Sequence, residues 1–353
     1  MAVLVIFQLL YTYVCVLYYR YFKRMLTWQI EALHLSLKFN THATGYAGPD
    51  RINFLVQVSD GTLNGFGEAA PQLRFGETPE LLLQQYQVLL MAGLAQVKNM
   101  ESLLELLVEH QPVNSLRFAV EAAYLHYFCQ LHSIPVNQLL RQRPPHHQPT
   151  CCSLPAMEPE TALHYIQEQR IDRFCCLKLR VSQETDAKLV HQVLHATEKP
   201  LMLEGGESWT DPDALLAFLK SLDGERVIFM EQPMPASMGC AYAHLKSQTP
   251  IPLVADESVT DEADFELLRE EFHGVNIKLM KAGGYLNAVR LLHQARKHGL
   301  MAMIGSMVET SLGIWCALQL SSGFDFASLD GFLMLSEEPF KLVREQNGVL
   351  YLK

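Results

Sequence analysis

The chain has 353 residues, of which 49% are apolar, so it can bury the core of one large domain or of two smaller ones. Its formal net charge is −10 and it contains no basic stripe, which argues against nucleic acid as a partner. The eight cysteines include no Cys-x-x-Cys spacing, so neither a zinc site nor a disulfide framework is indicated. This cysteine usage predicts a reducing, cytoplasmic compartment.

The N-terminal extension, residues 1–24, differs in composition from the rest of the chain. Its residues 2–19 form an uncharged run that three basic residues follow. The run is long enough to span a membrane, but it has neither the basic start nor the cleavage site of a signal peptide. We favour a translation start at Met25, with a membrane anchor as the alternative.

The next segments predict a pair of strands. Alternating or apolar runs at 28–37 and 52–59 indicate these strands, and the second one ends at an Asp60-Gly61 turn. The Gly-rich stretch GFGEAAP at 65–71 is expected to be irregular.

Two helices are predicted to follow. The first covers 78–94, with Thr78 as N-cap and Pro79 in the first turn, and the second covers 115–132. Strands and helices together predict an N-terminal α+β domain of residues 25–140.

A stretch rich in Pro and His, at 141–150, separates this domain from the remainder of the chain. Its His146 and His147 are adjacent and would face apart on any regular element. We interpret them as loop residues and not as metal ligands.

Short apolar segments recur every 22 to 27 residues in the second half of the chain, and helical segments such as DPDALLAFLKSL lie between them. Repeats of this kind indicate parallel strands joined by crossover helices. With a first strand near CCSLPAM there are eight units, which predicts a (β/α)8 barrel over residues 150–353. An open doubly wound sheet is the weaker alternative, because no Gly-rich phosphate loop follows any of these strands. The residues that close or mark the later strands are Lys178, Glu204, Glu231, Asp256, Lys278, Gly305 and Asp330.

Three carboxylates close consecutive predicted strands, namely Glu204, Glu231 and Asp256. The carboxyl ends of barrel strands meet at one rim, so these acids would repel each other unless a cation lies among them. Oxygen ligands suit a hard ion such as Mg²⁺ better than zinc. The pattern therefore predicts a Mg²⁺ site, against the alternative of three unrelated acids at strand ends.

Cations flank the acidic strands on both sides. Lys178 and Arg180 lie two positions apart on the preceding strand and so share one face, while Lys278 lies on the following strand. Salt-bridge partnership with the acids is the alternative role, and it suits Arg180 best. For Lys278 we favour the role of a base, because a nearby divalent cation lowers the pKa of an amine. The implied chemistry is removal of a proton next to a carboxylate, with positive charge stabilising the enediolate that forms.

The chain resembles the enolase superfamily in its muconate-lactonising branch, and within it the dipeptide epimerases. The resemblance runs from about residue 28 to the end. The motifs that carry it are GFGEAAP, EQP at 231–233, ADES at 255–258, NIKLMKAGG at 276–284, IGSMVETSLGI at 304–314 and LDGFLML at 329–335.

The resemblance implies a modified (β/α)8 TIM barrel with an N-terminal α+β capping domain. The C-terminal tail is expected to return to this cap. It implies one Mg²⁺ per subunit, held by Glu204, Glu231 and Asp256, and Lys278 as an acid/base. A small-molecule partner follows from it, a dipeptide or a related carboxylate, and a homo-oligomer is compatible with it.

The resemblance also implies where the substrate binds. In these epimerases an Asp-x-Asp pair near the last strand binds the ammonium group of the dipeptide. The positions expected to contact the substrate in this chain are Ser306, Glu309, Ser328 and Asp330. The segment 39–51 is the expected cap loop that selects the substrate, and its glycines are either hinges or plain turn residues.

Two departures from the family pattern concern acid/base chemistry and the metal. The second lysine of a Lys-x-Lys motif, normally an acid/base, is Arg180 here, and arginine stays protonated in proteins. Lys178, on the same strand face, is the candidate substitute. The first metal ligand, usually an aspartate, is Glu204, and Glu207 in the same EGGES run is the fallback ligand.

A third departure concerns the ammonium site, where Ser328 replaces the first aspartate and Asp330 alone remains. The leading hypothesis is a Mg²⁺-dependent dipeptide epimerase, a member of the racemases and epimerases that act on amino acid derivatives. A lyase similar to o-succinylbenzoate synthase is the second hypothesis, although Asp330 favours a substrate with an ammonium group. A catalytically silent, metal-binding relative is the third, motivated by Arg180 and Glu204.

Overall fold

The computed structural model describes residues 26–38, 50–143, 147–154, 159–184, 187–222 and 225–353. The predictions for the N-terminal extension, for most of the cap loop and for His146 lie outside these residues. Within the described ranges, no helix combines the length and the apolar character needed to cross a membrane.

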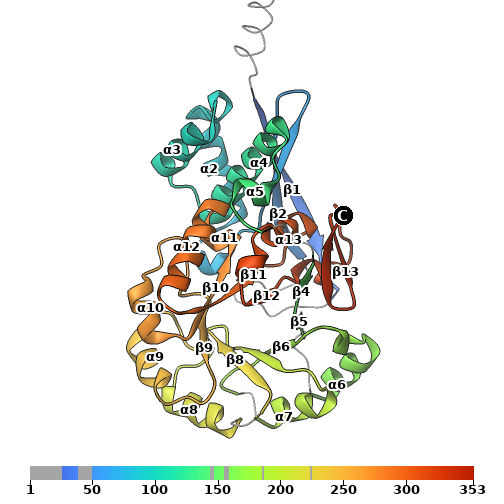
Figure 1. Cartoon of the computed structure of the whole chain (residues 1–353), viewed down its shortest axis with the longest axis vertical. Helices are drawn as coiled ribbons and strands as arrows, with labels where there is room; N and C mark the ends of the chain where they lie inside the picture. Colours follow the sequence, from blue (N-terminus) through green and yellow to red (C-terminus); the bar gives the residue numbers. More distant parts are fainter. Residues whose placement is uncertain (1–25, 39–49, 144–146, 155–158, 185–186, 223–224) are drawn as a thin grey trace, which may run out of the picture.

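The first part of the chain forms a cap, which lies at the top of Figure 1. Its antiparallel sheet has the order β1 (Thr27–Ser36), β2 (Asp50–Ser59) and β3 (Asn64–Ala69). The helices that accompany the sheet are α2 (Pro79–Met91), α3 (Met100–His110), α4 (Asn114–His132) and the short α5 (Val136–Leu139). The two predicted strands and the two predicted helices are confirmed, and the Thr78 side chain accepts the Leu81 N–H as expected of an N-cap.

The prediction that 65–71 is irregular is wrong, because most of this stretch belongs to β3, which pairs with β2. Its glycines serve close packing and not a loop. A Cβ atom on Gly67 would lie 2.1 Å from the carbonyl oxygen of Ala119, and one on Gly65 would lie 1.9 Å from that of Ala123. Helix α4 can therefore pack directly on the backbone of the strand.

The second part of the chain is a barrel of eight parallel strands in the order β12-β11-β10-β9-β8-β7-β6-β5. The Cys151 N–H donates to the Ala327 carbonyl oxygen at 3.2 Å and so links the first strand region to the last. The predicted eight units and the barrel are confirmed, and the open doubly wound sheet is excluded. The strands are β5 (Cys152–Ser153), β6 (Leu177–Arg180), β7 (Leu201–Glu204), β8 (Val227–Glu231), β9 (Leu253–Ala255), β10 (Gly274–Lys278), β11 (Met301–Gly305) and β12 (Phe326–Ser328).

Helices connect the strands on the outside of the barrel (Figure 1). They are α6 (Pro159–Glu168), α7 (Ala187–Ala196), α8 (Pro212–Ser221), α9 (Gly239–Lys246), α10 (Phe265–Glu271), α11 (Leu279–Ala282), α12 (Tyr285–Lys297) and α13 (Ser311–Leu318). The C-terminal hairpin of β13 (Val343–Gln346) and β14 (Val349–Leu352) pairs with β4 (Gln148–Pro149). Before it, the Ser336 N–H donates to the Ser36 carbonyl oxygen at 2.8 Å, so the chain returns to the cap after the last barrel strand.

Two buried glutamates of the cap bind the N-termini of barrel helices. Glu68 in β3 accepts the N–H groups of Thr310 and Gly313 at 2.9 and 3.1 Å, at the start of α13. Glu121 in α4 accepts the Leu286 N–H at 3.1 Å, at the start of α12. Burial raises the pKa of both carboxyl groups, that of Glu121 to about 7, against the hydrogen bonds that lower it. These contacts fix how the cap sits on the barrel.

We predict that Glu68→Ala destabilises the protein by about 3 kcal/mol, because it leaves buried N–H groups at the start of α13 without an acceptor. Glu109→Ala, at an exposed position of α3, is the control and should change the free energy of unfolding by less than about 0.5 kcal/mol. Urea unfolding measures both changes. Equal stability of the two variants would contradict the assigned role of Glu68.

Candidate functional site

A cavity of about 520 Å³ lies where the cap meets the carboxyl ends of the barrel strands. The cap contributes Arg74 and Phe75 from a short 3-10 turn (Leu73–Phe75). The predicted site residues that line the cavity are Lys178, Arg180, Glu204, Asp256, Lys278, Ser306, Ser328 and Asp330. Glu231 and Glu309 are buried and do not line it.

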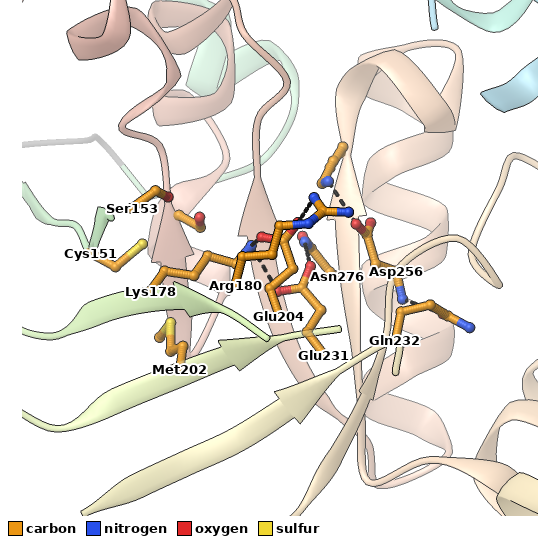
Figure 2. A network of polar contacts seen from close by, with 12 residues as sticks. Cys151, Ser153, Lys178, Arg180, Met202, Glu204, Glu231, Gln232, Asp256 and Asn276 are labelled. Atoms are coloured by element: carbon orange, nitrogen blue, oxygen red, sulfur yellow. Dashed lines mark hydrogen bonds and ion pairs between the residues drawn. The ribbon is translucent and has the colours of Figure 1, made fainter. Parts of the chain in front are cut away.

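Lys178 binds two of the three predicted acids at once. Its Nζ lies 3.0 Å from Oε2 of Glu204 and 2.8 Å from Oε2 of Glu231. The strand register places Glu204 directly beside Glu231, so one ammonium group can reach both, as Figure 2 shows. The second oxygen of Glu231 accepts the Asn276 side-chain N–H at 2.7 Å. The two glutamates therefore converge on a single cation.

The third acid, Asp256, forms ion pairs with two lysines. Lys278 Nζ lies 2.7 Å from Oδ2 and Lys281 Nζ lies 2.5 Å from Oδ1. Lys281 was not predicted as a site residue. The signal for it was its place three residues after Lys278, in the short helix α11 that continues from β10.

The charges of this cluster shift the pKa values of its members. Burial disfavours the ionised Asp256, but Lys278 and Lys281 outweigh it and hold the pKa of this carboxyl well below its usual range. Burial raises the pKa of Glu231, and the nearby Asp256 and Glu204 raise it further against the effect of Lys178. All three carboxylates are therefore close enough to repel one another.

The pKa of Lys278 differs from the prediction. Burial disfavours the charged amine, but Asp256 and Glu231 outweigh it, so the pKa lies above its ordinary value. The prediction assumed an amine next to a divalent cation; in this structure the nearest charges are carboxylates, and they stabilise the ammonium form.

The cations of β6 and β10 face each other across the barrel. Three strands separate β6 from β10 in one direction, namely β7, β8 and β9, and the other three separate them in the opposite direction. Lys178 and Lys278 thus lie on opposite sides of the mouth, with the acids of the intervening strands between them. A small molecule in the cavity would meet an amine from either side.

Arg180 lies above this cluster, at the open end of β6. Its Nη1 is 3.4 Å from Oε1 of Glu204, and Figure 2 shows the guanidinium group reaching over that carboxylate. A Cβ atom on Gly206, whose φ is +52°, would lie 2.5 Å from Nη2 of Arg180. The turn after β7 thus depends on glycine to leave room for the arginine.

Glu207, the predicted fallback ligand, binds the cap. Both of its carboxylate oxygens pair with the Arg74 guanidinium group, one of them at 2.6 Å from Nη2, and Oε1 accepts the Ala236 N–H at 2.9 Å. A bidentate pair of this kind orients the carboxylate toward Arg74 and away from the cluster. This contact joins the cap to the turn that follows β7.

The predicted substrate-binding residues have separate environments. Asp330 is buried, and its Oδ2 accepts the Ser153 N–H at 2.6 Å; burial raises the pKa of this carboxyl against that hydrogen bond. The Ser306 N–H donates to the Ser328 carbonyl oxygen at 3.0 Å. The carboxylate of Glu309 accepts the Met307 N–H at 2.7 Å, away from the cavity. Glu257, which follows Asp256 and does line the cavity, was not predicted.

The carboxylates of this cluster are the candidate donors for a metal ion. Within the part of the chain that the structure describes, no three His, Cys, Asp or Glu side chains are arranged to hold an ion, because lysines lie between the carboxylates. The donors themselves are oxygens, and one ammonium group already draws Glu204 and Glu231 together. Their chemistry suits a hard cation such as Mg²⁺.

Comparison with curated proteins finds relatives among epimerases. The chain is 34% identical over 179 residues to an L-Ala-D/L-Glu epimerase of Bacteroides thetaiotaomicron. The matched region covers 51% of this chain and 47% of the relative. It is 26% identical over 310 residues to a hydrophobic dipeptide epimerase of a Flavobacteria bacterium, covering 84% and 86%. The matched region spans about half the length of the first curated relatives.

Solved structures share the fold. The dipeptide epimerase from Enterococcus faecalis, described as complexed with Mg and the dipeptide L-Leu-L-Tyr, superposes with a TM-score of 0.81 at 23% identity, covering 92% of this chain and 96% of the other. The model of the family described as enolase C-terminal domain-like matches residues 161–344, more than half of the chain. The protein therefore belongs to this family, in the enolase superfamily.

Proposed function

We propose that the protein is a Mg²⁺-dependent isomerase that removes the proton alpha to the carboxylate of a small amino acid derivative, with dipeptides as the substrates. One observation carries the proposal: acids at the carboxyl ends of β7, β8 and β9 gather between a lysine of β6 and a lysine of β10 that faces it. Epimerisation needs a proton donor and an acceptor on opposite faces of one carbon, and this arrangement supplies both. The names of the curated relatives, which are epimerases of dipeptides, support the same activity.

Glu204, Glu231 and Asp256 are the residues that would hold Mg²⁺. When bound, the ion supplies the positive charge that makes a carboxylate substrate easier to deprotonate. For the three acids to hold the ion, their ion pairs with the lysines would have to break. Since Lys178 and Lys278 now neutralise these acids, both amines become available to the substrate when another cation takes their place.

Lys278 is the acid/base we assign to one face of the substrate carbon. Its side chain reaches the cavity from the end of β10, where it accepts the proton at Nζ once it is neutral. On the opposite face, Lys178 is the amine that returns a proton. Arg180 remains charged and stabilises the negative charge that develops on the substrate.

The same arginine favours a second candidate function. Arginine side chains stay protonated in proteins. Lys178 is deeply buried between two glutamates. Chemistry with Lys278 as the only base would then resemble a lyase or a one-base exchange. Deuterium exchange separates the two, because only the epimerase inverts the configuration while it exchanges the proton.

The first prediction from this proposal concerns Lys278. With Mg²⁺ and a library of L,L-dipeptides in D₂O, the wild-type protein should place deuterium at the alpha carbon, and Lys278→Ala should reduce the rate by about 10²- to 10⁴-fold. Lys220→Ala, at an exposed position of α8, is the control and should keep the wild-type rate. NMR follows the exchange, and circular dichroism checks the fold. Retained exchange in the folded Lys278→Ala variant would exclude this lysine as the base.

The second prediction concerns the arginine. If Lys178, buried between two glutamates, returns the proton only slowly on the β6 side, wild-type exchange should outpace inversion. Arg180→Lys should then raise the ratio of inversion to exchange by about tenfold or more, because it adds an amine that titrates. Chiral chromatography of the products, beside the NMR measurement, gives the ratio. If the wild-type ratio of inversion to exchange is near one and Arg180→Lys does not change it, the arginine does not limit inversion.

The third prediction concerns the metal and needs no substrate. Mg²⁺ at 100 times its Kd should stabilise the folded protein by about 2.7 kcal/mol. Glu231→Gln should abolish this gain because it removes a charged ligand, whereas Glu109→Gln should leave it unchanged. Thermal unfolding with and without Mg²⁺ measures the gain. An undiminished Mg²⁺ effect in Glu231→Gln would place the ion elsewhere.

A further inference from the structure

Sulfur atoms gather at the base of the barrel, at the N-terminal end of β6. Cys175 and Cys176 immediately precede β6, and their Sγ atoms lie 3.6 Å apart. Cys175 is exposed, whereas Cys176 is buried inside the barrel, where its Sγ lies 3.9 Å from the Met202 sulfur. Cys151, on the neighbouring strand region, is also buried in this layer. None of these thiols takes part in the proposed reaction.

The pair combines two properties that dithiol chemistry requires. One thiol must be open to a reagent, and a second thiol must lie close enough to react with the product. Cys175 meets the first condition by its exposure and Cys176 meets the second by its distance. Adjacent residues of a regular strand point to opposite faces, but this pair lies just before the strand begins, and its two thiols turn toward each other.

The surroundings also differentiate the two thiols. The contact with the Cys176 thiol, helped by backbone N–H groups and Lys199, lowers the pKa of Cys175 to about 7 against the effect of burial. The contacts with Cys151 and Cys175 raise the pKa of Cys176. The surroundings thus favour ionisation of the Cys175 thiol over that of the Cys176 thiol.

We propose that Cys175 and Cys176 form an oxidant-reactive dithiol, in which Cys175 is the nucleophile toward hydroperoxides and Cys176 is the thiol that resolves the product. This inference is independent of the proposed isomerase activity. The pair lies at the far end of the strand from Arg180, so it is a separate modification site.

The chemistry takes two steps. The Cys175 thiolate attacks one oxygen of the hydroperoxide; the O–O bond breaks, and Cys175 sulfenic acid forms together with water or an alcohol. The Cys176 sulfur then attacks the Cys175 sulfur; the S–O bond breaks, and the hydroxyl leaves as water with the Cys176 proton. Two thiols lose two electrons to the peroxide, and a disulfide between neighbouring residues results.

The test uses the full-length protein, treated with a small excess of hydrogen peroxide in the presence of dimedone, which traps sulfenic acids. Trypsin cleaves after Arg173 and after Lys178, so one short peptide, residues 174–178, carries both thiols. In the wild type this peptide should lose about 2 Da, the mass of two hydrogen atoms, and should resist alkylation until it is reduced.

Variants assign the roles of the two thiols. Cys176→Ser should stop at the first step and carry dimedone on Cys175, whereas Cys175→Ser should show neither product. Cys240→Ser removes another exposed thiol, in α9, and should behave as the wild type.

Three outcomes would overturn the proposal. Dimedone on Cys175 in the wild type, to the same extent as in Cys176→Ser, would show that Cys176 does not resolve. A disulfide between Cys176 and Cys151 would show that Cys151, and not Cys175, is the partner of Cys176. An unmodified 174–178 peptide, with Cys240 oxidised in the same sample, would show that the pair is unreactive.

Discussion

Three carboxylates crowd the ends of neighbouring parallel strands, two of them buried and Glu204 partly exposed, and they can stay together only when positive charge lies among them. The cost of burying an ion exceeds what hydrogen bonds alone repay, so each acid needs a partner of opposite charge. Lys178 meets this need for Glu204 and Glu231, and Lys278 and Lys281 meet it for Asp256. In the proposed reaction Lys178 and Lys278 also transfer protons, so two of these side chains would serve both charge balance and chemistry.

The cap completes this arrangement through polar contacts with the barrel. Glu68 and Glu121 bind the first N–H groups of α13 and α12, and the positive ends of these helices favour the carboxylates. At the mouth itself, Arg74 of the cap pairs with Glu207 after β7. Both parts therefore line the cavity.

The departures from the family pattern affect proton transfer more than charge. Arg180 retains the positive charge of a lysine and still contacts Glu204, so the electrostatic balance survives. What arginine does not provide is a group that titrates near neutral pH. In the proposed reaction this position therefore bears on whether both faces of the substrate carbon have an acid or base, while its ion pair with Glu204 stays in place.

The eight barrel strands, their closing acids, Lys178 and Lys278 were predictable from the chain alone, whereas Lys281 was missed. A buried parallel strand is a local feature, with a short apolar run and a helix after it, and the barrel geometry brings the ends of all such runs to one rim. Contacts between distant segments were not predictable in this way. Strand β3 was predicted to be a loop because it is rich in glycine, but these glycines are needed where α4 packs against the strand. Glu207 was predicted to be a fallback metal ligand, but its partner is Arg74, which is distant in the sequence. The local pattern of apolar residues indicates which face of a segment is buried. The distant side chains that the segment contacts are decided only by the tertiary structure of the whole chain.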